Sequence, residues 1–122
     1  MVWNECDRPA VSERSEPPTV VVRHHGAAAA VLREVRAGAE EEGVPTILEE
    51  SAGDAGALAH AAALASRLEV GVGIDAAGGV AVHHATLPPE TPALTVPAGA
   101  GALQWRRAGA AAARLVTGLP IT

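Results

Sequence analysis

The chain has 122 residues, which is enough for one domain with a single core and too few for two. Its formal charge is −5, and its nine basic residues are all arginine. They form no basic stripe, which argues against a nucleic-acid-binding protein. No uninterrupted apolar segment approaches the roughly 20 residues that a membrane-spanning helix needs.

The expected core is built from small side chains. Phe and Tyr are absent, and most apolar residues are Ala, Val and Leu. Burial contributes about 25 cal/mol per Å² of apolar surface, so such a core gives modest stability unless another subunit covers further surface. The lone Cys6 cannot form an internal disulfide, and the chain begins without a signal-peptide pattern. We therefore expect a soluble protein of a reducing cytoplasm.

The first part of the chain divides into a leader and a strand–helix unit. Residues 1–18 have the polar, proline-ended composition of a disordered leader, so the folded domain is expected at 19–122. Thr19–Val22 is a β-branched run that predicts a buried strand. Apolar residues then recur at helical spacing until Gly43 provides a stop, and Pro45 prevents continuation.

The middle of the chain alternates between strand and helix signals and then changes direction. Thr46–Leu48 predicts a second strand, and Asp54 is placed to cap the helix Ala55–Ala65. Leu68–Ile74 predicts a third strand. After a glycine-rich turn, Val80–His83 is expected to return antiparallel to it.

The last elements complete the expected fold. Ala93–Val96 predicts a fifth short strand, and Leu103–Thr117 a final helix. One face of that helix should belong to the core: Trp105, Ala108, Ala112, Leu115 and Val116. The sum is a three-layer α/β/α sandwich around a mixed, mostly parallel sheet of about five strands with one antiparallel strand.

An acidic triplet, Glu40 to Glu42, ends the first helix where the helix dipole favours cations by about 0.3 to 1 kcal/mol each. Counting back from Glu41 in helical steps reaches Gly38 and Glu34, a stripe with little side-chain bulk that another backbone can approach closely. Two interpretations stay open. The triplet is a solvated helix end, or it offers a carboxylate to a metal ion or to a partner's cations.

Arg107 and Arg114 lie away from the core face of the last helix. They are either ordinary solvated charges or partners for acidic groups across an interface. Their spacing does not choose between the two.

No catalytic constellation stands out. The Asp75–Gly79 turn joins two strands, so no helix N-terminus follows it to hold a phosphate. His83 and His84 point to opposite faces of a strand and cannot both bind one metal ion. His24 and His25 follow the first strand, where a surface-turn role is favoured. A small enzyme acting alone therefore lacks supporting residues.

Five blocks of sequence, in order, resemble the small subunit of the diol/glycerol dehydratase-reactivating factor. They are Arg33–Val35, Glu40–Pro45, Ser66–Gly73, His83–Pro88 and Ala111–Pro120. The resemblance covers roughly residues 19–121. It implies a fold similar to that of the medium subunit of the dehydratase itself.

The resemblance implies a non-catalytic, chaperone-like subunit of a hetero-oligomer. Its large-subunit partner hydrolyses ATP, and the pair frees an adenosylcobalamin-dependent dehydratase of damaged cobalamin. In this scheme the small subunit leaves the large one and transiently replaces the dehydratase medium subunit. The resemblance also makes Glu41 a ligand of a Mg²⁺ or Ca²⁺ ion shared with the large subunit, whereas nucleotide and cobalamin are not expected on this chain alone. The surrounding interface would include Glu34, Gly38, Glu41, Arg107 and Arg114.

The alternative is a medium subunit of the dehydratase, a structural part of the enzyme. Length argues against it, because medium subunits of that family are longer. The expected location is the cytoplasm, with or without a bacterial microcompartment.

Overall fold

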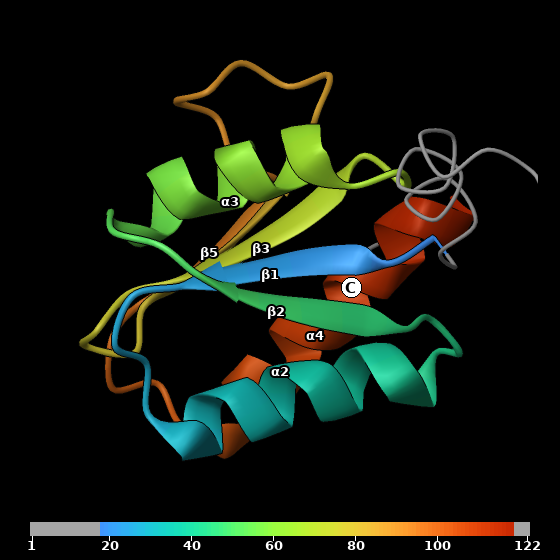
Figure 1. Ribbon diagram of the computed structural model, residues 1–122. Helices are drawn as coiled ribbons and strands as arrows, with labels where there is room; N and C mark the ends of the chain where they lie inside the picture. The colour runs from blue at the N-terminus through green and yellow to red at the C-terminus, as the bar shows by residue number, and fades with distance from the viewer. Residues whose placement is uncertain (1–17, 119–122) are drawn as a thin grey trace, which may run out of the picture.

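The computed structural model describes residues 18–118, so the expected leader lies outside the described residues except for Pro18. The elements in chain order are β1 (Val20–His24), α2 (Ala29–Glu41), β2 (Thr46–Glu50), α3 (Ala55–Ala65), β3 (Val70–Ile74), β4 (Val80–His84), β5 (Leu94–Val96) and α4 (Ala102–Thr117) (Figure 1). None of these helices has the length and apolar content that crossing a bilayer requires.

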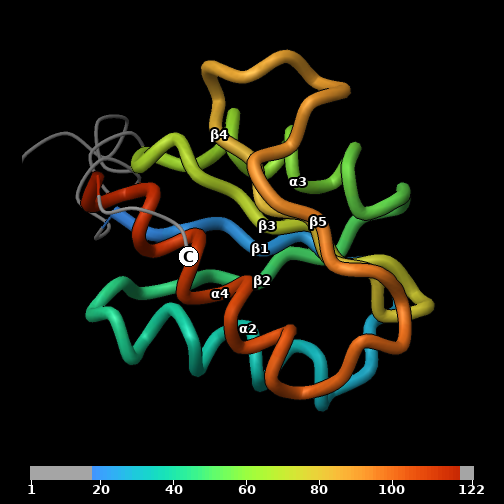
Figure 2. Tube along the Cα trace, turned by 180° about the vertical axis from the view of Figure 1, so that it is seen from behind, coloured from blue at the N-terminus to red at the C-terminus, as the bar shows by residue number. Residues whose placement is uncertain are grey.

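The sheet has five strands in the order β2-β1-β3-β4-β5. β1 pairs parallel with both β2 and β3, and β4 is antiparallel to both of its neighbours. Helix α3 covers one face, while α2 and α4 lie side by side under the other (Figures 1 and 2). The predicted three-layer α/β/α sandwich with one antiparallel strand is confirmed.

The main core lies between the sheet and the α2–α4 layer. Alternate strand residues point into it, because successive side chains of a strand face opposite ways. The strands contribute Val20, Val22, Val70, Val72, Ile74, Val80 and Val82. From α4, Ala108 and Ala112 are buried, with Trp105, Leu115 and Val116 partly buried against them, which confirms the predicted core face. Apart from His83, the largest fully buried side chains are valines and one isoleucine, as the composition predicts.

The opposite face of the sheet has almost no side-chain layer where α3 crosses β3. The sequence Val70–Ile74 alternates branched residues with Gly71 and Gly73, and both glycines face α3. A Cβ at Gly71 would overlap the backbone of Ala62 and Ala63. The helix backbone therefore rests directly on the strand.

Local signals set most element boundaries. Asp54 caps α3, its Oδ1 accepting the Ala57 amide at 2.8 Å, as predicted. β3 begins at Val70 and not at Leu68, because Glu69 has a φ of 64°, a left-handed conformation outside the β region. The turn after β3 is held by its own aspartate: Asp75 Oδ1 accepts hydrogen bonds from the amides of Ala77 and Gly79, at 3.0 and 2.8 Å.

Candidate functional site

Helices α2 and α4 touch through their backbones. A Cβ at Gly38 of α2 would overlap the carbonyl oxygen of Arg106, and a Cβ at Gly109 of α4 would overlap the carbonyl oxygen of Val35. The bare stripe of α2 is therefore covered by the chain's own last helix. The expectation that Gly38 offers a docking surface to another subunit is wrong, because this glycine is buried under α4.

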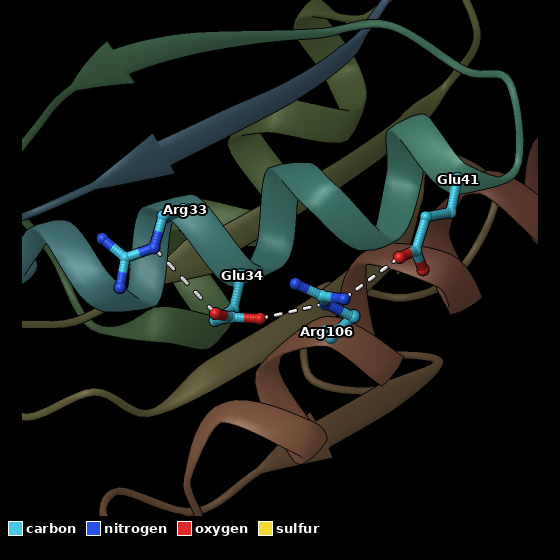
Figure 3. A network of polar contacts seen from close by, with 4 residues as sticks. All are labelled: Arg33, Glu34, Glu41 and Arg106. Atoms are coloured by element: carbon cyan, nitrogen blue, oxygen red, sulfur yellow. Dashed lines mark hydrogen bonds and ion pairs between the residues drawn. The ribbon is translucent and has the colours of Figure 1, made fainter.

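At this contact, the side chain of Arg106 from α4 lies between two carboxylates of α2 (Figure 3). Its Nε donates to Glu34 Oε1 at 3.0 Å, and its Nη1 donates to Glu41 Oε2 at 3.1 Å. Arg33 adds a longer ion pair to Glu34, at 4.0 Å. Glu34 and Glu41 flank Gly38 by one helical turn on either side, so the closest approach of the helices places Arg106 within reach of both.

The two carboxylates differ in exposure. The Glu34 side chain is 16% exposed, whereas that of Glu41 is 57% exposed. Glu41 is therefore largely exposed, although its Oε2 accepts a hydrogen bond from Arg106.

A single carboxylate oxygen suits a hard cation such as Mg²⁺ or Ca²⁺, which takes oxygen ligands. Residues 18–118 contain no group of three or more His, Cys, Asp or Glu that could hold a metal ion. A divalent ion at Glu41 would therefore need its other protein ligands from another molecule.

The other charges at this helix end are partly satisfied within the chain. Arg114 Nη2 lies 3.5 Å from Glu42 Oε2. Together with Arg106, it places positive charge from α4 beside the acidic triplet, at the helix end where the dipole favours cations. Glu40 is exposed and carries none of these contacts within the described residues.

Arg107 points elsewhere. It is exposed and lines a groove of about 690 Å³ between α4 and the edge strand β5, together with Thr95 and Gln104. Arg107 and Glu41 therefore do not belong to one cluster, although both are expected interface residues.

Of the histidines considered in the sequence, His83 has structural surroundings, whereas the Nδ1 of His24 is buried with no hydrogen-bond partner among the described residues. The His83 ring is fully buried, with its nitrogens 3.0 and 3.2 Å from the carbonyl oxygens of His84 and Pro89. The His83 and His60 rings pack edge to face, with their centroids 4.9 Å apart. These contacts attach the loop after β4 to α3, which is a structural role.

Sequence reasoning missed Arg106. One signal was available, because Arg106 shares a helical stripe with Gly109 and Ala110, and a bare stripe is where a second helix packs closely. The matching stripe on α2 was recognised, but nothing in the periodicity paired the two.

Comparison with known proteins gives four consistent relationships. Residues 16–122 match the dehydratase medium subunit family. The chain is 40% identical over 94 residues to a probable glycerol dehydratase-reactivating factor small subunit of Citrobacter freundii, covering 75% of this chain and 80% of that protein. A solved glycerol dehydratase reactivase superposes with a TM-score of 0.80 and 39% identity, over 87% of this chain and 97% of the other. A structure of diol dehydratase-reactivating factor complexed with ADP and Mg²⁺ also gives a TM-score of 0.80, at 33% identity, over 88% of this chain and 99% of the other.

Proposed function

Because this chain belongs to the dehydratase medium subunit family, we propose that it is the small subunit of a reactivating factor that serves a glycerol or diol dehydratase. One observation carries the proposal: the fold matches nearly the whole length of a reactivase chain, at 39% identity. The resemblance found in the sequence blocks is the same one.

In the proposed mechanism this chain works by binding and not by catalysis. A large subunit supplies ATP hydrolysis. This chain leaves it, takes the place of the dehydratase medium subunit and loosens the enzyme, so that damaged cobalamin leaves. Membership of the medium subunit family supports the exchange, since chains of one fold can compete for one docking site. The expected site of action is the cytoplasm or a microcompartment within it.

A second candidate function is a medium subunit of the dehydratase itself. The name of the matching family favours it. Near-complete coverage of the reactivase chain favours the first proposal.

The first prediction tests the reactivating role. A dehydratase inactivated during turnover should regain activity when it receives the cognate large subunit, this chain, ATP, Mg²⁺ and fresh adenosylcobalamin. Omitting this chain should leave activity at the background level, because the competitor for the medium-subunit site is missing. The measurement is the rate of aldehyde formation after each addition.

Equal recovery with and without the chain would remove the proposed role. Permanent co-purification with the dehydratase, in place of a separate medium subunit, would establish the second candidate instead.

The second prediction concerns the metal ligand that the family resemblance implies. Glu41 would contribute one carboxylate oxygen to a divalent ion held mainly by the large subunit, and the bound ion would link the two chains. Glu41→Gln keeps the side-chain size and removes the charge. It should weaken the complex with the large subunit and reduce its Mg²⁺ dependence, because a lost ligand leaves the ion under-coordinated.

Glu40→Gln is the matched control, since it makes the same change one residue away on an exposed side chain without these contacts. Solvated charges of this kind contribute little. Calorimetric titration of the large subunit at several Mg²⁺ concentrations compares the two variants. If they behave identically, the acidic triplet is only a solvated helix end.

A further inference from the structure

The sheet has an open edge at β5. This strand is the last in the order β2-β1-β3-β4-β5, and it pairs only with β4. On its other side no strand lies beside it in the part of the chain that the structure describes. An unpaired strand edge presents backbone N–H and C=O groups to which another extended segment can bind.

The groove of about 690 Å³ between β5 and α4 reaches this open edge. It is lined by all three residues of β5, although successive side chains of a strand face opposite ways. Leu94 and Val96 face α4 and pack on the core, whereas Thr95 between them is exposed. A groove that also contacts Thr95 therefore extends from the α4 side of the strand to its edge.

Arg107 gives the α4 side of this groove a positive charge without a partner. Within residues 18–118 it is the one arginine that makes no hydrogen bond or ion pair. Each of the others makes at least one: Arg23, Arg33, Arg36, Arg67, Arg106 and Arg114. The chain is acidic overall, with a formal charge of −5, yet none of its described carboxylates neutralises Arg107. The groove therefore favours an occupant that carries a carboxylate.

The same side of α4 also offers apolar contact. Leu103 lies one helical turn before Arg107 and is 61% exposed, which makes it one of the few large apolar side chains on the surface. Pro97, Ala100 and Ala111 add small apolar surfaces to the groove itself. Backbone groups, apolar surface and one cation thus lie together.

We propose that this groove binds an extended segment of the cognate large subunit, which adds to the sheet as a strand beside β5 and places a carboxylate on Arg107. In this mode of recognition, main-chain hydrogen bonds supply affinity and alternate side chains supply specificity. The inference rests on the proposed function, which provides the partner, and adds the surface and the chemistry of docking. This surface is separate from the acidic end of α2.

The first test is a calorimetric titration of the cognate large subunit with variants of this chain. Arg107→Gln should raise the Kd of the complex about tenfold, as expected for the loss of a close charge pair at an interface. Arg33→Gln is the matched control, because it removes the same charge from an exposed arginine of α2 that lies outside the groove. It should change the Kd by no more than about twofold.

Gln104→Glu gives a second variant that does not depend on removing Arg107. It places a carboxylate in the groove, where it competes with the partner's carboxylate for Arg107, so it should also raise the Kd. Added salt should narrow the difference between the unaltered chain and Arg107→Gln, because salt screens charge pairs. All the altered side chains are exposed, and thermal unfolding of the free chain checks that each variant is folded.

Hydrogen exchange tests whether the occupant pairs as a strand. In the free chain the outward-facing amides of β5 should exchange rapidly, since no strand covers that edge. In the complex they should exchange more slowly, because the added strand accepts hydrogen bonds from them. Amides of β5 that are already protected in the free chain would mean that residues 1–17 or a second copy fill the groove, which would overturn the proposal.

Two further results would overturn it: Arg107→Gln binding like Arg33→Gln, or equal exchange of the β5 amides in the free chain and in the complex. In either case the proposed function stands, because the chain still binds its partner. If the unaltered chain does not bind the large subunit at all, the proposed function fails and the docking mode fails with it.

Discussion

Gly73→Ala should destabilise the fold by about 3 kcal/mol or more, because the added methyl group enters a backbone contact that cannot yield locally. Its Cβ would overlap Ala55 and Ala59 main-chain atoms and lie 2.9 Å from the Leu58 Cβ. To admit it, α3 has to move away from β3 along its length. Urea unfolding followed by circular dichroism gives the change in the free energy of unfolding.

Gly56→Ala is the control, placed in the helix that rests on β3. The nearest atom to its added Cβ is Asp54 Oδ1, at an ordinary 3.7 Å. Alanine is favoured over glycine in a helix by about 0.8–1 kcal/mol, so this variant should be neutral or more stable. If Gly73→Ala were as stable as Gly56→Ala, α3 would not rest on β3 as described.

Gly38→Ala should destabilise the fold by a comparable amount, about 3 kcal/mol, because it disrupts the contact between α2 and α4. Its Cβ would overlap the Arg106 carbonyl oxygen and lie 2.9 Å from the Ala110 amide nitrogen, so α2 and α4 would have to separate. Separation also moves Arg106 away from Glu34 and Glu41. The same urea experiment measures the loss.

Ala37→Gly, one residue earlier in the same helix, sharpens the comparison. Helix propensity alone makes Gly38→Ala favourable and Ala37→Gly unfavourable, each by about 1 kcal/mol. The helix contact predicts the opposite order, with Gly38→Ala clearly the less stable variant. Observing the propensity order would contradict the backbone contact between α2 and α4.

The order of helices and strands could be predicted from the sequence, because the signals that start and end each element are local. The alternation in Val70–Ile74 marks a strand with one bulky and one bare face, and Asp54 marks a helix start. Several element ends differ from the prediction by one or two residues, as at Glu69 and at Ala102, where α4 begins. The positive φ of Glu69 belongs to a turn closed by the hydrogen bond from its amide to the Ser66 carbonyl, which residue type does not reveal.

The sequence also identified the surface of α2 that carries Glu34, Gly38 and Glu41, since helical spacing shows which residues share a stripe. It did not identify what covers that stripe. In the folded chain α4 covers it, and Arg106 lies within hydrogen-bonding distance of Glu34 and Glu41, which are 72 and 65 positions away in the chain. Periodicity shows that a face can accept a close neighbour, but the choice of neighbour depends on how the whole sheet brings distant helices together.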